Sequence, residues 1–540
     1  MRRKLLHLRL TRRWSEKIGM FILILAATLA VAFVSPVSAS AYSQRQQQVI
    51  QGAQVSINAG ASVGSIPRAA FGLNTAAWDS HLLDSSVPGL LQQTGVKLLR
   101  FPGGSTSDYY QWQSNTALTC SICGGVNAND TFDAFMGIVK ATGAQAMITI
   151  NYGSGTPQEA AGWVQYANKG DPGYNGPQPT YAGGSSTGQN YGIKYWEIGN
   201  ELYGNGTYGA TWEYDLHSLG PTSYANNVVA YSQAMKAVDP GIKIGLVLTA
   251  PGNWPDGVTS ASSPQPWNDT VLPIACSSID FVVAHWYAQG PTGESDAGLL
   301  NAPENGESTG VSFTPSIPGM VSTLRSKINQ YCGSRANDIQ IMVTETNSVS
   351  YNPGKQTVSL VNALFMDDDY MTWLENGVSN VSWWDLHNSI MPNDNNSPSL
   401  YGTANYGDYG VLSSGESANG ASEPPADVPF PAYFGLQMLN ALGRGGDRMI
   451  TASSTQGLVS VFAVKQANGK IAVLFINKDP NTVYDVQLSW SGFSPGPNPT
   501  AYFYGENSQY ITVTHEHGTV PDHIQFLPPY SLTTLVVSPQ

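Results

Sequence analysis

The chain has 540 residues, of which 41% are hydrophobic and 12% are charged. This apolar content excludes a disordered chain, because it is enough to form a large core. The length exceeds what one core usually holds, so we expect two domains, or one large barrel with an appended domain.

Residues 1–41 have the pattern of a secretory signal peptide. Seven Lys and Arg residues accompany an apolar run at 20–34, and small residues suited to cleavage follow at 37–41. The 15 residues of this run fall short of the roughly 20 needed to span a bilayer, which disfavours a membrane anchor. We therefore expect cleavage, secretion to the extracellular space and no stable membrane insertion afterwards.

The charge of the exported chain bears on its partners. Removing residues 1–41 takes away seven cations and Glu16, and changes the formal net charge from −13 to −19. Such a surface repels phosphates, so we expect no nucleic acid partner. A neutral polysaccharide or oligosaccharide is compatible with it.

Eight short runs rich in Val, Ile and Leu recur along the chain, each followed by a stretch long enough for a helix. We predict strands at 69–74, 96–103, 144–152, 193–201, 243–249, 279–287, 339–346 and 378–387, with helices that include 131–142, 222–238 and 354–376. Near-continuous apolar strands are typical of a parallel sheet covered on both faces. The pattern predicts a (β/α)8 TIM barrel. A doubly wound open sheet is disfavoured, because no Gly-rich phosphate turn follows the first strand.

The remaining segments define the expected domain boundaries. After 446 the apolar residues alternate with period two, which predicts a C-terminal β-sandwich at 446–540. Residues 42–66 are expected to add a strand to this sandwich, and 67–445 to form the barrel. The stretch 388–428, rich in Asn, Gly, Ser and Pro, is expected on the catalytic rim of the barrel.

The four cysteines favour disulfides in an exported chain. Three pairings are possible, and we favour a local bridge between Cys120 and Cys123 with a longer one between Cys276 and Cys332. A redox or metal role for the CxxC pair is disfavoured, because neither a second Cys pair nor a His at zinc spacing accompanies it.

Two glutamates close apolar strands of the predicted barrel. Glu201 ends the fourth strand and Glu345 ends the seventh. A buried carboxylate is costly unless it is paired, and the active site of a barrel lies at the carboxyl ends of its strands. Paired carboxyls across a barrel mouth suit glycosidic hydrolysis, with retention when they are about 5–5.5 Å apart and inversion when they are about 6.5 Å apart or more.

Four motifs carry a resemblance to a known family. YWEIGNELYG at 195–204 and ETN at 345–347 resemble the retaining glycoside hydrolases of clan A, and LLRFPGG at 98–104 with AHWY at 284–287 brings the chain closest to the family 51 α-L-arabinofuranosidases. The resemblance implies that Glu201 is the acid/base, Glu345 the nucleophile and Asn200 a ligand of the sugar 2-hydroxyl. It also implies that Arg100 lies under Glu345 and holds it ionised.

Other residues are expected to line the site with less support. His285 and Tyr287 share a face of the sixth strand and are expected beside the two carboxyls. Asn74, Asn151 and Trp383 are expected to bind substrate from neighbouring strand ends, and Glu197 to be a structural partner inside the barrel. The run at 367–369 is interpreted as a solvated helix face rather than a metal site.

The sugar stays open at this point. Family 51 enzymes carry a glutamate just after the first strand that grips arabinose, whereas here that position supplies Asn74 and no acid. The chain is therefore interpreted as a secreted retaining glycosidase, best described as arabinofuranosidase-like. The alternatives are a β-glucuronidase, a β-xylosidase, an endo-β-glucanase or a non-catalytic carbohydrate-binding protein. No metal or other cofactor is expected, and the pKa of Glu201 is expected to be raised.

Overall fold

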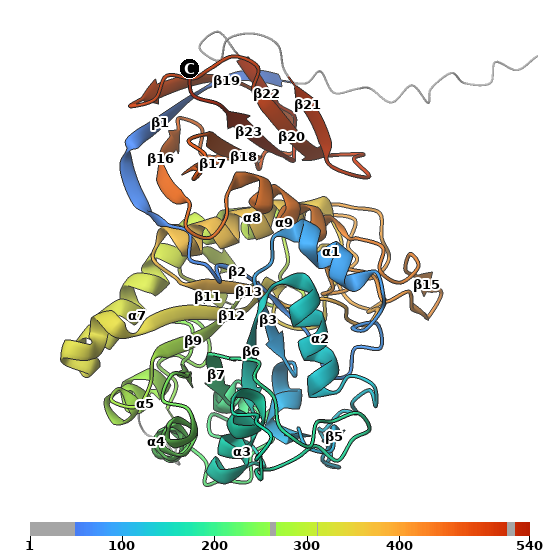
Figure 1. Cartoon of the computed structure of the whole chain (residues 1–540). Helices are drawn as coiled ribbons and strands as arrows, with labels where there is room; N and C mark the ends of the chain where they lie inside the picture. The colour runs from blue at the N-terminus through green and yellow to red at the C-terminus, as the bar shows by residue number, and fades with distance from the viewer. Residues whose placement is uncertain (1–48, 260–265, 310–311, 516–523) are drawn as a thin grey trace, which may run out of the picture. The chain divides into compact units, whose positions relative to one another are not determined.

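The computed structural model describes residues 49–259, 266–309, 312–515 and 524–540 (Figure 1). The expected signal peptide at 1–41 lies outside the described residues. Within these ranges, none of the helices has both the length and the apolar character required to cross a membrane.

Eight parallel strands close into a barrel, and the predicted (β/α)8 architecture is confirmed. The strands pair in chain order, and the eighth pairs with the first to complete the ring. Each of the eight apolar runs overlaps one of these strands, and β9 and β12 extend two or three residues beyond the predicted ends. Their bounds are β2 (Phe71–Asn74), β3 (Leu98–Phe101), β6 (Gln145–Ile150), β7 (Tyr195–Ile198), β8 (Lys243–Val247), β9 (Phe281–Gln289), β12 (Gln340–Val349) and β13 (Asn380–Trp383).

Helices follow the strands and bury the outer wall of the barrel. Local sequence sets their ends: the Thr131 hydroxyl accepts a hydrogen bond from the amide of Ala134 at the start of one helix, and Gly143 ends it with a φ of 67° that favours glycine. The helices are α1 (Val87–Thr94), α2 (Phe132–Thr142), α3 (Pro157–Asn168), α4 (Pro221–Val238), α5 (Trp267–Ala275), α6 (Asp296–Asn305), α7 (Ile317–Cys332), α8 (Leu360–Glu375) and α9 (Pro431–Leu442).

Short elements decorate the loops of the barrel. They are the 3-10 helices η1 (Gly104–Tyr109), η2 (Leu202–Gly204) and η3 (Gly333–Asp338), and the strand pairs β4 (Tyr110–Gln111) with β5 (Thr116–Ala117), β10 (Glu307–Thr309) with β11 (Ser312–Thr314), and β14 (Ser417–Ala418) with β15 (Ala421–Ser422).

The C-terminal part is a β-rich domain, as predicted. Its strands form one nine-stranded sheet in the order β21-β20-β23-β18-β17-β16-β1-β19-β22. The N-terminal strand lies inside this order and pairs antiparallel with β16 and parallel with β19, so the blue strand runs among the orange and red ones (Figure 1). The bounds are β1 (Val49–Ser65), β16 (Arg448–Ser454), β17 (Val459–Lys465), β18 (Ile471–Asn477), β19 (Thr482–Ser491), β20 (Thr500–Gly505), β21 (Thr512–His515), β22 (Ile524–Leu527) and β23 (Ser531–Val537).

The two expected disulfides are both present. Cys120 bridges Cys123 within a loop, and Cys276 at the end of α5 bridges Cys332 at the end of α7. The longer bridge links α5 and α7, which contact each other, and the two cysteines are 56 residues apart in the chain.

The interpretation of the acidic run as a solvated face is wrong. Asp367, Asp368 and Asp369 lie on α8 and are fully buried, because α8 packs against α9 and the strand β18 as well as the barrel. Asp368 pairs with Lys478 at 3.0 Å and accepts a hydrogen bond from Ser460. We call these three aspartates with Lys478 the junction cluster.

Candidate active site

The carboxyl ends of the barrel strands open into a pocket of about 870 Å³. Both predicted catalytic carboxyls, Glu201 after β7 and Glu345 on β12, line it together with Asn200 and with His285 and Tyr287 of β9. The rest of the lining comes from loop residues: Trp78, Gly103, Gly104, Ser105, Thr106, Tyr109, Tyr203, Trp212, Asn253, Trp254, Ser350, Tyr351 and Trp384.

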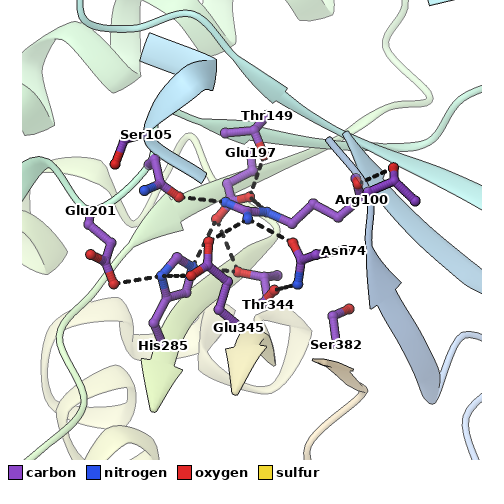
Figure 2. A network of polar contacts seen from close by, with 12 residues as sticks. Asn74, Arg100, Ser105, Thr149, Glu197, Glu201, His285, Thr344, Glu345 and Ser382 are labelled. Carbon is purple, nitrogen blue, oxygen red and sulfur yellow. Dashed lines mark hydrogen bonds and ion pairs between the residues drawn. The ribbon is translucent and has the colours of Figure 1, made fainter. Parts of the chain in front are cut away.

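Arg100 is the centre of the polar network under the pocket (Figure 2). Its Nε donates to Glu197 Oε2 and its Nη1 to Glu345 Oε1, both at 2.7 Å, and its Nη2 donates to Asn200 Oδ1 at 2.8 Å. Arg100 is fully buried, so the two carboxylates are its charge partners in a site that water does not reach. The pKa of Arg100 is raised, since the charges of Glu197 and Glu345 outweigh the cost of burial.

His285 joins the two predicted catalytic carboxyls. Its Nδ1 lies 2.9 Å from Glu201 Oε1 and 3.5 Å from Glu345 Oε2, while its Nε2 lies 3.0 Å from the Thr344 hydroxyl (Figure 2). The Tyr287 hydroxyl donates to the same Glu345 oxygen at 2.9 Å. Glu345 therefore has hydrogen-bond donors on both oxygens, one from Arg100 and one from Tyr287.

The expected rise in the pKa of Glu201 is not what the site produces. Burial raises the pKa of this carboxyl, but the hydrogen bond and charge of His285, with the hydroxyl of Tyr203 and the indole of Trp212, lower it further than burial raises it. Burial alone would lower the pKa of His285, and the charges of Glu345 and Glu201 raise it instead. The contact between Glu201 and His285 contributes to both shifts, so the two groups titrate as a coupled pair.

The distance between the two carboxyls is short. Glu201, His285 and Glu345 each place a ligand atom so that all three atoms lie within 4.8 Å of one another. An oxygen of Glu201 is therefore no more than 4.8 Å from an oxygen of Glu345. This closest approach is shorter than the separation of about 6.5 Å or more that is typical of inverting sites.

The same three residues have ligand types that a metal ion accepts. Within the described ranges they are the group of acidic and histidine side chains close enough to hold one. The Arg100 guanidinium 2.7 Å from Glu345 places a fixed positive charge beside them, and this charge disfavours a second cation. The arrangement suits proton transfer and nucleophilic attack better than metal binding.

Asn200 is held in one orientation by three neighbours. Its Oδ1 accepts from Arg100, its Nδ2 donates to Glu213 Oε1 at 2.8 Å, and its backbone amide donates to Asp108 Oδ2 at 3.0 Å. The Ser105 hydroxyl donates to the same Glu213 oxygen at 2.6 Å. The second hydrogen of the Asn200 amide is thereby directed to the pocket, where a sugar hydroxyl can accept it.

Three residues expected to bind substrate are placed elsewhere. Asn74 is fully buried and uses its side chain to hold Arg100 Nη1 and the carbonyls of Thr344 and Trp383. Asn151 hydrogen-bonds the Tyr110 carbonyl and the Ser154 hydroxyl. Neither these two nor Trp383 is among the residues that line the pocket, and a direct contact with substrate stays an untested prediction for all three.

Trp383 shows why a strand-end tryptophan is a weak indicator. Its ring is fully buried and lies 6.0 Å from Phe365 and 6.4 Å from Tyr370, both on α8. It faces the helices, because side chains alternate along a strand, and the next residue, Trp384, lines the pocket instead. Arg100 is also absent from the pocket lining, and it hydrogen-bonds Glu345 from the buried interior of the barrel.

Sequence reasoning missed several residues of the pocket wall. Trp78, Tyr203 and Trp212 lie in loops that follow strands, and Glu213 lies behind Asn200 in the same loop as Trp212. These loops lack a periodic pattern. Their position after the first and fourth strands was the one available signal.

The chain is similar to curated proteins over part of its length and to solved structures over most of it. No protein-family model matches the chain. A probable α-L-arabinofuranosidase C of Aspergillus fumigatus is 26% identical over 168 residues, which cover 29% of this chain and 30% of the relative. An intracellular exo-α-(1→5)-L-arabinofuranosidase of Bifidobacterium longum is 27% identical over 218 residues, 39% of this chain and 35% of the relative. The chain thus spans about a third of the length of these curated relatives.

Solved structures match over most of the chain. The GH51 α-L-arabinofuranosidase of Thermotoga petrophila has a TM-score of 0.66 at 17% identity and covers 90% of this chain and 100% of its own. A family 44 xyloglucanase of Paenibacillus polymyxa has a TM-score of 0.60 at 12% identity and covers 91% and 100%. In fold, and in a shared segment of sequence, the chain resembles the family 51 α-L-arabinofuranosidases, as its motifs indicated.

Proposed function

We propose that this protein is a retaining glycoside hydrolase that uses Glu201 as acid/base and Glu345 as nucleophile. The observation that carries the proposal is the pair of carboxyl oxygens no more than 4.8 Å apart in one pocket. Carboxyls at this spacing act by double displacement, with a covalent glycosyl intermediate on one of them.

Each neighbour has a part in the first step. Arg100 and Tyr287 hold both oxygens of Glu345, which orients the carboxylate for attack on the anomeric carbon. His285 passes a proton to Glu201 across the hydrogen bond between its Nδ1 and Glu201 Oε1, which lie 2.9 Å apart, and Glu201 gives a proton to the departing oxygen. Asn200 donates to the 2-hydroxyl, a contact that strengthens as the sugar ring flattens.

The second step reverses these roles. Once the leaving group has gone with the proton, Glu201 is a carboxylate beside a neutral imidazole, and it takes a proton from an incoming water molecule, which His285 can then receive. Water attacks the glycosyl ester on Glu345 and releases the sugar with its original anomeric configuration. Side chains and one water molecule supply every proton and bond in this scheme, so the proposal includes no cofactor.

We propose α-L-arabinofuranosides as the best guess for the substrate, because the curated relatives are named for that activity. One observation favours a second candidate, an endo-β-glucanase: the fold is also similar to that of a family 44 xyloglucanase, and Asn74 leaves the first strand without the acid that family 51 enzymes use to hold arabinose. A β-glucuronidase or β-xylosidase stays in the same mechanistic class. A non-catalytic binding protein is disfavoured by the complete carboxyl pair.

We also propose export of the mature chain. The basic and apolar pattern of residues 1–41 and the two disulfides both support an oxidising compartment. One of the similar proteins is described as intracellular, so the relatives do not decide the matter.

Two variants of the carboxyls test the mechanism. Glu201→Ala is expected to keep measurable cleavage of an activated nitrophenyl glycoside, and azide should rescue it and give a glycosyl azide of unchanged configuration. Glu345→Ala should lose about ten-thousand-fold in kcat on every substrate, and azide should restore only a product of inverted configuration.

The sugar that the enzyme cleaves is identified with the same type of nitrophenyl glycoside assay. Nitrophenyl glycosides of arabinofuranose, xylose, glucuronic acid and glucose are tested beside polysaccharide digestion. Exchanged behaviours of the two variants would reverse the roles of Glu201 and Glu345. Near-normal turnover of a natural substrate by both variants would refute a catalytic site here.

A further inference from the structure

The pocket has an aromatic wall on one side, formed by Tyr203, Trp212 and Trp254, and we call it the tryptophan wall. The ring centroids of Trp212 and Trp254 are 5.2 Å apart, and Tyr203 lies 6.3 Å from each at a steep angle. Tyr203 is buried, whereas 38% of Trp212 and 43% of Trp254 is exposed. Trp196 and Trp267, which belong to the core, are fully buried.

The wall is rigidly backed. Gly204 lies directly under the Trp212 ring, where a Cβ atom would come within 2.4 Å of Cε2, so only glycine permits this close approach. Within the wall, Tyr203 packs between the two exposed indoles and the buried Trp267, and the ring centroids of Tyr203 and Trp267 are 6.0 Å apart. Two exposed indoles held in place at a pocket mouth form a preformed apolar surface, which is typical of a ligand contact rather than of packing.

The side of the pocket on which the wall lies follows from Glu201. The Trp212 indole Nε1 donates to Glu201 Oε2 at 2.9 Å, while the other oxygen of Glu201 faces His285. Under the proposed function Glu201 protonates the leaving group, so a residue bound to its outer oxygen lies beside the leaving group. Trp384 also lines the pocket but is joined to the strand of Glu345, because its backbone amide donates to the Thr346 carbonyl, and its ring lies against Gly104.

We propose, as a consequence that rests on the proposed function, that the tryptophan wall binds a pyranose residue as the leaving group. A pyranose chair with equatorial substituents presents a flat face of C–H groups, and such faces stack on indole rings. The wall therefore selects substrates in which the cleaved sugar is attached to a chain of xylose or glucose type. Trp212 also orients Glu201, so binding of the leaving group and placement of the acid meet at one residue.

The experiment compares two substrates that release the same sugar. One is an oligosaccharide whose leaving group is a xylo- or cello-oligosaccharide, and the other is the glycosyl fluoride, which has no leaving sugar to stack. Trp254→Ala should lower kcat/KM for the oligosaccharide by about tenfold relative to the fluoride, since stacking on one indole is worth roughly that factor. Trp384→Ala is the matched control, and it should affect both substrates alike.

A second measurement keeps this inference separate from the proposed function. Intrinsic fluorescence is titrated with xylotetraose and with cellotetraose in the wild type and in Trp254→Ala, with no turnover required. Hydrolysis with an unchanged ratio of the two substrates in Trp254→Ala would overturn the wall as a leaving-group site and leave the glycosidase intact. Absence of hydrolysis in the wild type would refute the proposed function, and the titration would then decide the wall: quenching lost in Trp254→Ala supports it, and equal or absent quenching overturns it.

Discussion

Two of the places in which the protein buries acidic side chains differ in how they hold charge. At the barrel mouth, Glu197 and Glu345 each receive a 2.7 Å hydrogen bond from Arg100, and Glu201 and Glu345 also face a pocket. In the junction cluster, Lys478 forms an ion pair with Asp368, whereas neither oxygen of Asp367 accepts a hydrogen bond from a described residue. Carboxyls are buried in both places, but the pocket gives a substrate access to those at the barrel mouth and not to those of the junction cluster.

The pKa values follow the same division. Burial raises the pKa of Asp367 and Asp369 well above the usual range, and that of Asp368 to about 6 despite Lys478. At the mouth, the side chain of Glu201 is 18% exposed, and its pKa is lowered, because His285, with Tyr203 and Trp212, more than offsets burial. A cluster of buried acids thus indicates an active site only where cations keep it ionised and a substrate can reach it.

The largest effect is expected from removing the cation at the mouth. Arg100→Met leaves Glu345 and Glu197 without their shared guanidinium, so kcat should fall by about a hundred- to a thousand-fold. Lys478→Met is the matched control, because it removes a buried cation from the junction cluster instead. Steady-state kinetics per folded molecule should show normal kcat in Lys478→Met, and an equal loss in both variants would mean that the two clusters are not distinct in function.

The next effect concerns stability, and here we expect the change in Lys478→Met, the variant that served as the control for activity. Lys478→Met leaves Asp368 buried without its counter-charge and should lower the free energy of unfolding by about 3 kcal/mol at pH 7. Chemical denaturation followed by circular dichroism measures it. The double variant Lys478→Met with Asp368→Asn should recover much of the loss, and failure to recover any would show that Lys478 stabilises by packing rather than by charge.

A smaller effect is expected in the pH dependence of the rate. The proton needed by Glu201 is held with His285, whose pKa is raised, so activity should decline only when the pH exceeds that raised value. His285→Asn removes the imidazole and leaves the proton on a carboxyl alone. The alkaline limb of kcat/KM should therefore move to lower pH. A limb that stays in place would mean that His285 does not take part in holding this proton.

Much of the fold was predictable from the sequence. Eight apolar runs and their spacing indicated the barrel, because buried parallel strands need continuous apolar residues. The alternation of Ala53, Val55, Ile57 and Ala59, which are all buried, indicated an extra strand. The solvated reading of Asp367 failed because a run of acids on a helix normally faces water, and only the packing of α8 against a second domain removes that face.

The site was predictable where chain order and parity determine position. Glu201, Glu345, His285, Tyr287 and Asn200 came from strand ends, and they line one pocket. Trp383 was expected to line the pocket, but its neighbour Trp384 does so, because adjacent side chains of a strand point to opposite faces. Asn74 points into the barrel and hydrogen-bonds Arg100. Trp212 could not be predicted, because its approach to Glu201 depends on the path of an irregular loop. The pKa of Glu201 depended in turn on His285, whose distance the sequence does not contain.

The stereochemistry of hydrolysis tests the central claim most directly. An aryl glycoside that the enzyme accepts is hydrolysed in an NMR tube, and the anomeric proton of the first-formed sugar is recorded before mutarotation. A nucleophilic Glu345 with its carboxyl oxygen no more than 4.8 Å from that of Glu201 predicts a product with the anomeric configuration of the substrate. First formation of the opposite anomer would contradict a covalent intermediate and with it the roles assigned to both glutamates.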